Sequence, residues 1–426
     1  MYVLYSAILA AGMVLASPFW IWQMLRHGKY RKGFEERWGW VPARILREPN
    51  QRIIWIHAVS VGEVLTVVGL VRALRHRFPQ HRVLISTTTD TGQQLARNRF
   101  GAENVFYFPL DFAVAIRPYF KNLQPELVIL AETEFWPNFL RLAQESGAQV
   151  AVVNARISDR SLPGYRRFRA LLRRVLDQID LFLAQTDEDQ RRLVEIGAPV
   201  GRVQVSGNLK FDVPEPTEPP ILSVMRVALV AEQGVGPLIV CGSTIEGEEA
   251  MLVQAFKTLL TSHPKAIMLL APRHPERFTV VADLLKQQNV PFQLRSQWRG
   301  SDIAGSIFLL DSIGELAALY ALAQVAFVGG SLVPSGGHNI LEPARYGAAI
   351  LVGPHTENFR DIIELFRTNN AVVVTDSSRL TQDFVALISN EANRIAFGKR
   401  ARETVQKQLG ATEKTLVALS QLLKQA

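Results

Sequence analysis

The chain has 426 residues, 48% of them hydrophobic. The length predicts two domains, and the hydrophobic fraction supplies enough apolar residues for two cores and excludes an intrinsically disordered protein. The single cysteine, Cys241, excludes an intrachain disulfide and cysteine-based zinc modules, and the formal net charge of +8 indicates an anionic surface or substrate.

The first 25 residues contain no charged side chain, and a basic cluster follows at 26–32. A helix of this length runs roughly 37 Å, enough to cross the hydrocarbon layer of a membrane. Pro18 also fits a helix that lies on the membrane, and the small residues near Ala16 fit a cleaved signal peptide. We predict a membrane anchor over 1–25 with the rest of the chain in the cytoplasm, and leave open whether the anchor spans the membrane.

Short apolar runs alternate with helical patterns from residue 50 onward. Continuous runs of Val, Ile and Leu are typical of strands buried on both faces of a parallel sheet. Their alternation with helices predicts an α/β fold with two doubly wound sheets. The predicted strands are Ile53–Ala58, Val83–Ser86, Leu127–Ala131, Gln149–Val153, Leu181–Ala184, Val203–Ser206, Leu238–Cys241, Ala266–Ala271, Ile307–Leu310, Val325–Val328, Ala349–Val352 and Val372–Val374.

A proline-rich stretch at 213–220 separates the two sets of strands and reads as a semi-rigid linker. The chain is therefore expected to consist of the anchor, an N-terminal domain at 26–212, the linker, a C-terminal domain at 221–410 and a last helix at 411–426.

Polar and glycine-rich clusters directly follow the apolar runs. Parallel sheets bind ligands at the carboxyl ends of their strands, so these clusters predict one active-site cleft shared by the two domains. The clusters are His57–Glu63, Thr87–Gly92, Glu132–Asn138, Asn154–Arg156, Gly207–Asp212, Gly242–Glu246, Pro272–Pro275, Asp311–Glu315 and Gly329–Glu342.

Three residues of the N-terminal domain are candidates for acid–base or electrostatic chemistry. Glu63 falls in the first turn of a helix, where it is either a general base or a glutamate that complements the helix dipole. Glu132 follows a fully apolar strand, where burying a carboxylate costs several kcal/mol unless a cation pairs with it. Lys210 is either a cation that stabilises a phosphorylated leaving group or a solvated lysine at the domain boundary.

A small-residue turn at Ser243 and Thr244 opens the first helix of the C-terminal domain. Backbone N–H groups at such a helix start can bind an anion, such as a phosphate group. The turn lacks the Gly-Lys-Ser/Thr sequence that ends a Walker A motif. The side chain of Ser243 or Thr244 can instead act as a simple N-cap.

A second glycine-rich loop contains Gly337 and His338 and is another candidate phosphate loop. Glu342 follows Asn339 by three residues near a helix start. That spacing fits an Asn N-cap with its capping partner, and equally a carboxylate that binds a ribose.

Seven motifs, in this order along the chain, together resemble the 3-deoxy-D-manno-octulosonic acid (Kdo) transferases of lipopolysaccharide biosynthesis. They are HAVSVGE (57–63), AETEFWPN (131–138), NARISDRS (154–161), GNLKFD (207–212), GSTIEGEE (242–249), APRHPER (271–277) and GGHNILEP (336–343). The resemblance implies the GT-B architecture, in which two Rossmann-like domains face a cleft. It also implies that the N-terminal domain binds the acceptor, that the C-terminal domain binds the nucleotide sugar, and that the last helix can pack back on the N-terminal domain.

The same resemblance implies a reaction. The donor would be CMP-Kdo and the acceptor a lipid A precursor, lipid IVA, at the cytoplasmic face of the bacterial inner membrane, in an inverting transfer that needs no metal or other cofactor. Glu63 would be the general base, and Glu132 and Lys210 would stabilise the transition state. The expected CMP-binding residues are Pro272, Arg273, Ile313, Gly314, Glu315, Asn339, Ile340, Leu341 and Glu342. Ile245 stands where family members often have histidine.

Two other functional classes fit parts of the sequence. Another GT-B enzyme could use a different activated sugar or epimerise a nucleotide sugar. A membrane-tethered protein could bind anionic lipid through its basic surface without catalysis, but such a protein does not need so many polar motifs at strand ends. Nucleic acid is not an expected partner, because no recognition motif or stacking platform accompanies the basic residues.

Overall fold

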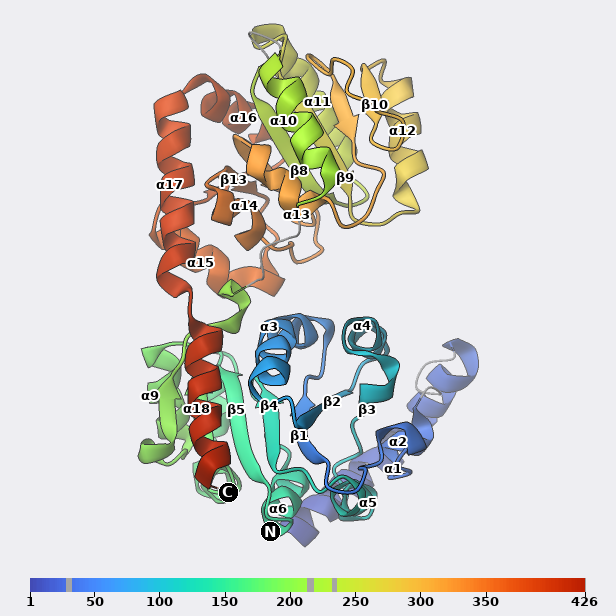
Figure 1. Ribbon diagram of the computed structural model, residues 1–426, viewed down its shortest axis with the longest axis vertical. Coiled ribbons are helices and arrows are strands. Elements are labelled where there is room, and N and C mark those ends of the chain that lie inside the picture. Colours follow the sequence, from blue (N-terminus) through green and yellow to red (C-terminus); the bar gives the residue numbers. More distant parts are fainter. Residues whose placement is uncertain (28–32, 213–217, 232–235, 426) are drawn as a thin grey trace. The chain divides into compact units, whose positions relative to one another are not determined.

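Figure 1 shows the computed structural model of the chain, which describes residues 1–27, 33–212, 218–231 and 236–425. The chain forms two compact units. Unit 1 comprises Met1–Pro214 together with Leu409–Ala426, and unit 2 comprises Glu215–Gln408.

Unit 1 is built on a seven-stranded sheet in the order β3-β2-β1-β4-β5-β6-β7, and every neighbouring pair is parallel. The central strands are buried on both faces, which explains their continuous apolar runs. The strands are β1 (Arg52–His57), β2 (His81–Thr87), β3 (Val105–Tyr107), β4 (Leu127–Ala131), β5 (Gln149–Ala155), β6 (Leu181–Ala184) and β7 (Val203–Val205).

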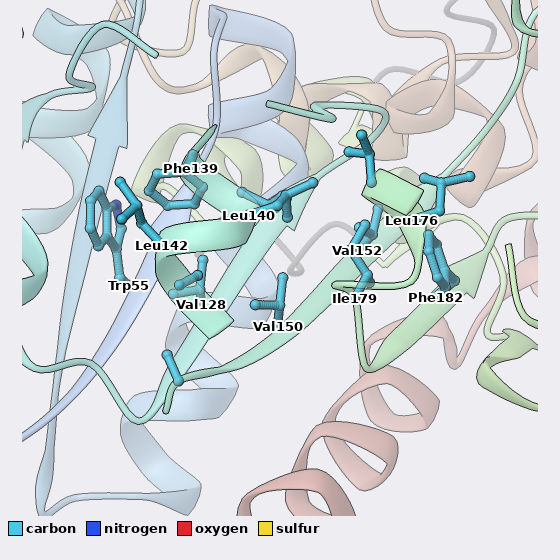
Figure 2. Packing of buried hydrophobic residues seen from close by; sticks show 14 of the residues in the cluster. Trp55, Val128, Phe139, Leu140, Leu142, Val150, Val152, Leu176, Ile179 and Phe182 are labelled. Atoms are coloured by element: carbon cyan, nitrogen blue, oxygen red, sulfur yellow. The ribbon is translucent and has the colours of Figure 1, made fainter. Parts of the chain in front are cut away.

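Helices cover both faces of this sheet. One core packs α3, α4 and α18 on the sheet, and the other packs α5, α6, α8 and α9 on the opposite face. Figure 2 shows part of the second core, in which Phe139 of α6 meets the ring of Trp55 edge-on with 5.0 Å between centroids. The helices are α1 (Tyr2–His27), α2 (Phe34–Arg37), α3 (Val61–Arg77), α4 (Asp90–Phe100), α5 (Ala113–Leu123), α6 (Pro137–Glu145), α7 (Leu162–Arg167), α8 (Arg169–Leu176), α9 (Asp187–Ile196) and α18 (Ala411–Gln425), with short 3₁₀ turns at Ala43–Ile45, Ala102–Asn104, Val200–Arg202 and Leu209–Phe211.

The last helix, α18, is part of unit 1. Its N-terminal N–H groups are capped by Asp212, whose carboxylate accepts hydrogen bonds from the amides of Gly410 (2.8 Å) and Thr412 (2.5 Å). Leu419 of α18 is fully buried in the core shared with α3. The final residue of the GNLKFD motif therefore anchors this helix.

Unit 2 repeats the design with the order β10-β11-β9-β8-β12-β13-β14, again parallel throughout. Its strands are β8 (Leu238–Thr244), β9 (Ile267–Pro272), β10 (Phe292–Leu294), β11 (Ile307–Leu309), β12 (Val325–Val328), β13 (Ala349–Val352) and β14 (Val373–Val374). Its helices are α10 (Pro220–Ala231), α11 (Glu248–Ser262), α12 (Arg277–Gln287), α13 (Leu316–Leu319), α14 (Leu341–Tyr346), α15 (Arg360–Thr368), α16 (Leu380–Ser389) and α17 (Glu391–Gln408), with 3₁₀ turns at Tyr320–Leu322 and Glu357–Phe359.

The predicted α/β class with two parallel sheets is confirmed, and each of the twelve predicted strands has a counterpart. Two strands were missed, β3 and β10. Each has three residues and lies at a sheet edge, where it pairs with a single neighbour.

The N-terminal helix α1 begins beside α6. Its half-buried positions recur at helical spacing through Tyr2, Tyr5, Ser6, Leu9, Met13 and Ala16. Among the described residues, no helix combines the length and the apolar character needed to cross a membrane. The predicted anchor therefore stays a prediction.

Candidate active site

Glu63 lies where β1 passes into α3, at the carboxyl edge of the sheet in unit 1. Ser60 caps α3, and its hydroxyl accepts a hydrogen bond from the Glu63 amide at 3.5 Å. The Glu63 carboxylate accepts in return from the Val59 amide (2.8 Å) and from the Ser60 hydroxyl (2.9 Å). This reciprocal capping box fixes the carboxylate at the first turn of the helix.

The Glu63 carboxyl has a raised proton affinity. Burial raises its pKa to about 7, against the opposing hydrogen bonds from Val59 and Ser60, and the negative charges of Glu132 and Glu134 raise it further. A carboxyl with a pKa near neutral pH can exchange a proton with a substrate hydroxyl, which suits a general base.

Glu132 follows β4 and is paired with Lys210. The Lys210 ammonium lies 3.3 Å from a carboxylate oxygen of Glu132, and each side chain is 24% exposed. The backbone of Glu132 is left-handed, with φ of 58°, a conformation that costs a non-glycine residue on the order of 1–3 kcal/mol. Strain of this kind at a partly exposed charged pair is typical of functional sites.

Glu134 adds a third carboxylate to this edge. Its oxygen accepts a hydrogen bond from the indole N–H of Trp136 at 2.9 Å. Burial raises the pKa of Glu134, and the neighbouring charge of Glu132 raises it further. Three mutually repelling carboxylates next to one lysine favour binding of a proton or of a group with developing positive charge.

A buried polar network fixes the backbone that carries Lys210. Asn154, fully buried with φ of 55°, accepts a hydrogen bond from the Leu209 amide at 3.0 Å through its side chain. Its main-chain carbonyl accepts from the Gln185 amide group at 3.0 Å. Gln185 in turn accepts from Asn208 (2.9 Å), whose side-chain oxygen accepts from the Lys210 amide (3.0 Å). The network therefore fixes the backbone that leads into Lys210, together with the Lys210 amide.

In unit 2, a buried glutamate occupies the backbone donors of two loops at the carboxyl ends of β8 and β12. The Glu248 carboxylate accepts hydrogen bonds from the amides of Ile245 (3.1 Å), Gly330 (2.8 Å), Ser331 (2.9 Å) and Leu332 (2.9 Å). These N–H groups serve the protein's own carboxylate in this structure and are not free to bind a phosphate.

The two residues proposed for the first phosphate loop have different surroundings. Thr244 is fully buried and its hydroxyl donates to Glu249 at 3.4 Å, while Arg277 holds the same carboxylate through two 3.1 Å contacts. Ser243 is left-handed, with φ of 56°. The structure thus gives Thr244 a structural partner, and a phosphate role for this turn stays a prediction.

Asn339 and Glu342 form the polar start of α14. The Asn339 side chain accepts from the Leu341 amide at 3.1 Å and donates to Glu342 at 3.5 Å. The N-cap of α14 is Ile340 and has no side-chain cap, so the predicted Asn N-cap is not formed, and the ribose-binding interpretation of Glu342 stays a prediction. Ile340 and Leu341 are buried beside Asn339. Burial raises the pKa of Glu342, while Asn339 and the cations Arg273 and Arg345 oppose that rise.

His338 lies in the same loop, with its ring against the backbone of Gly330. Burial lowers its pKa to about 4, and the positive charge of Arg273 adds to that effect. Its buried Nε2 atom has no hydrogen-bond partner among the described residues. Gly337 beside it is left-handed, with φ of 76°. The loop thus holds a neutral imidazole with one unused, buried ring nitrogen beside the cation Arg273.

The loop after β11 contains the remaining candidates. The Glu315 carboxylate accepts hydrogen bonds from Nε and Nη2 of Arg295, at 3.0 and 2.8 Å, and from the Ser312 hydroxyl. Ile313 is 67% exposed, and Gly314 is left-handed with φ of 94°. The carboxylate of Glu315 thus shapes the loop, and the exposed Ile313–Gly314 tip is free to meet a ligand.

The strand order explains which candidates come together. The strands β11, β9, β8 and β12 are neighbours, so the loops that follow them share one sheet edge. Pro272 ends β9 at this edge, and Arg273 follows it. Glu63, Glu132 and Lys210 gather at the corresponding edge in unit 1. Each unit thus carries a polar cluster of its own, and the predicted shared cleft stays a prediction.

Among the described residues, no group of three or more His, Cys, Asp and Glu side chains is arranged to hold a metal ion. The expectation of a metal-free transfer is untested. Asp111, Gln185, Glu248 and Arg295 were not identified from the sequence as site residues. Asp111 follows β3, and the missed strand removed the signal that would have drawn attention to it.

Comparison with known proteins identifies the family. The family described as 3-deoxy-D-manno-octulosonic-acid transferase (kdotransferase) matches residues 32–213. The chain is 34% identical over 400 residues to the 3-deoxy-D-manno-octulosonic acid transferase of Haemophilus influenzae, covering 93% of this chain and 92% of that protein. It is 35% identical over 421 residues to the enzyme of the same name from Bordetella pertussis, covering 95% of each.

The fold is shared more widely. The crystal structure of a UDP-GlcNAc 2-epimerase from Neisseria meningitidis bound to UDP-GlcNAc has a TM-score of 0.55 and 12% identity, and the match covers 88% of this chain and all of that one. This likeness shows the two-domain α/β fold alone. With the family match and the two relatives, the chain belongs to the 3-deoxy-D-manno-octulosonic acid transferases, which are glycosyltransferases of lipopolysaccharide synthesis.

Proposed function

We propose that the protein transfers Kdo from CMP-Kdo to a glucosamine hydroxyl of a lipid A precursor, lipid IVA, with inversion at the anomeric carbon. The observation that carries this proposal is the Glu63 carboxylate, whose pKa is raised to about 7 beside the Glu132–Lys210 pair. A base, an acid-rich edge and a cation in one cluster supply what a single displacement needs.

In the proposed step, Glu63 takes the proton of the acceptor hydroxyl as its oxygen bonds to C2 of Kdo. The bond from C2 to the phosphate oxygen breaks, and its electron pair leaves with CMP. Positive charge develops on the sugar and is stabilised by Glu132, while Lys210 stabilises negative charge on the leaving group. No metal or other cofactor takes part in this proposal.

The nucleotide would bind at the carboxyl edge of the sheet in unit 2. The cation Arg273 and the neutral imidazole of His338 are suited to the CMP phosphate, since together they offer charge and a ring nitrogen. Glu342 would accept from the ribose hydroxyls, and the exposed Ile313–Gly314 tip would contact the base. The turn at Ser243 would add a contact to the phosphate side of the ligand.

We further propose that α1 attaches the enzyme to the cytoplasmic face of the bacterial inner membrane. The helix turns polar side chains such as Tyr5 and Ser6 toward unit 1 and exposes aliphatic ones. Val3 is 85% exposed and Leu15 is 81% exposed. A helix that faces water exposes polar side chains, whereas α1 exposes apolar ones. This supports contact between the exposed face of α1 and lipid.

The test is a transfer assay with CMP-Kdo generated in situ and a tetraacylated lipid A precursor, in which products are resolved by mass and the anomeric configuration is read by NMR. The proposal predicts Kdo-bearing lipid with inverted configuration. Retention of configuration would overturn the single-displacement mechanism. Turnover of another nucleotide sugar in place of CMP-Kdo would overturn the donor.

A further inference from the structure

The first two turns of α1 make specific polar contacts with unit 1. The Tyr5 hydroxyl donates to the carboxylate of Asp111, and the Ser6 hydroxyl accepts from the side-chain amide of Asn138 at 2.9 Å. The guanidinium of Arg141 lies over the ring of Tyr2, 5.0 Å from its centroid. Contacts of this kind fix a helix in one orientation, whereas a lipid-facing anchor does not need them.

Asp111 caps α6, and Asn138 is the second residue of that helix. Asp111, 3% exposed, accepts from the backbone amides of Asn138 (3.2 Å) and Phe139 (2.8 Å). The Asn138 side chain also donates to the main-chain carbonyl of Asp111 at 2.6 Å. The Asp111 carboxylate thus joins Tyr5 of α1 to the first amides of α6, and any loss on one side leaves a buried carboxylate short of a donor.

The candidate catalytic acids immediately precede α6. Only Phe135 and Trp136 separate Glu134 from Pro137, the first residue of the helix, and the Trp136 indole holds Glu134. Trp136 also packs on Phe108, with 6.1 Å between ring centroids. A shift of the α6 N-terminus therefore displaces the loop that carries Glu132 and Glu134.

We propose that Tyr5 and Ser6 are positioning residues of the active site, which act through Asp111 and Asn138 on the loop that carries the catalytic acids. The N-terminal helix then has two separable functions. Its exposed face meets the membrane, and its inner face holds the acidic loop in the geometry that transfer requires. Only the kinetic measurement rests on the proposed function, and the hydrogen-exchange measurement is independent of it.

The experiment compares Tyr5→Phe, Ser6→Ala and the double variant with Val3→Ala and Ile8→Ala. The two control residues are on the exposed face of the same helix, 85% and 64% exposed. Activity is measured with acceptor in detergent micelles, where tethering to a bilayer plays no part. Backbone hydrogen exchange at Asn138 and Phe139 is measured on the same samples.

The proposal predicts that kcat of the double variant falls by about tenfold or more, as expected for the loss of two hydrogen bonds, with little change in KM for the donor. The amides of Asn138 and Phe139 exchange faster in the double variant. The single variant Ser6→Thr, which keeps a hydroxyl, and the exposed-face controls match the wild type in both properties. If the double variant does not fold, kcat and amide exchange of Tyr5→Phe alone test the proposal, because this variant keeps the ring and removes only the hydroxyl.

Unchanged exchange and unchanged kcat in a folded double variant would overturn the inference. A fall in kcat for the exposed-face controls as large as that for the inner-face variants would do the same. If wild type proves inactive with CMP-Kdo, the proposed function fails, and the exchange of Asn138 and Phe139 still decides whether α1 holds α6.

Discussion

The ammonium of Lys210 lies 3.3 Å from the carboxylate of Glu132, whose backbone is held at a left-handed φ of 58°. The two residues are 78 positions apart in the chain, Glu132 directly after β4 and Lys210 in the 3₁₀ turn Leu209–Phe211. Their contact gives the acidic edge of the sheet a cation next to Glu63.

Lys210→Ala removes this cation, and we expect kcat to fall by about 10²–10³, in line with the loss of a preorganised charge. The unpaired Glu132 also repels the ionised form of Glu63, so the pH at which activity is half-maximal should rise. A pH profile of kcat for the variant measures both effects. Lys121→Ala, at an exposed position on α5, is the matched control and should leave the profile unchanged.

Glu63 predicts a particular pH dependence of stability. The pKa of Glu63 is raised in the folded state to about 7, from an ordinary value of 4.5. The folded protein therefore binds this proton more tightly than the unfolded chain, and the resulting stabilisation is fully present below pH 4.5 and is lost as the pH rises through 7.

Glu63→Gln should abolish that component. Urea unfolding of wild type and variant is measured at several pH values between 4.5 and 8. The difference in unfolding free energy between the two proteins gives the contribution of Glu63 at each pH. A constant difference across this range would contradict a raised pKa. Glu246→Gln, at an exposed glutamate in unit 2, controls for the effect of removing a carboxylate.

Asn154 allows hydrogen bonding and backbone strain to be separated. Asn154→Ala and Asn154→Gly both lose the bond to the Leu209 amide, but glycine tolerates φ of 55° without strain. We expect the alanine variant to be less stable than the glycine variant by about 1 kcal/mol, with kcat reduced similarly in both because Lys210 loses its support. Chemical denaturation and steady-state kinetics measure the two properties, and wild-type kcat in either variant would exclude the positioning role.

Glu248→Gln should destabilise unit 2 strongly. Gln has one acceptor oxygen, whereas the carboxylate serves four backbone amides, so buried donors lose their partners at about 1–3 kcal/mol each. Thermal unfolding measures the loss, and CMP binding by calorimetry should weaken as the loop after β12 loosens. Glu246→Gln is the control here too, since the Glu246 side chain is 89% exposed. Equal melting temperatures for the two variants would show that the network contributes nothing.

The fold was largely predictable because the central strands are long and apolar on both faces, as in Ile53–His57 and Leu127–Ala131. The two missed strands, β3 and β10, are short edge strands whose pairing depends on tertiary contacts. The sequence also predicted that the polar clusters after the strands lie along one edge of each sheet, because the carboxyl ends of parallel strands meet at one edge.

The sequence did not predict which polar residues serve the protein itself. Glu248 and Thr244 belong to the same motif, yet the structure uses both internally, since Glu248 bonds backbone amides across to β12. A partner such as Gly330, 82 residues from Glu248, gives no local signal in the sequence. The connection from Tyr5 to Asp111 was hidden for the same reason, and because an apolar N-terminal segment indicates a membrane contact before a protein one.

The measurement that tests the central claim most directly is the single-turnover rate of Kdo transfer by wild type and Glu63→Gln, with saturating CMP-Kdo and the lipid acceptor, at pH 8. The glutamine keeps the shape of the side chain and its capping position but cannot take the proton. The account predicts product from the wild type and a rate at least about 10²-fold lower for the folded variant. A variant rate within twofold of the wild-type rate would contradict the assignment of Glu63 as the general base.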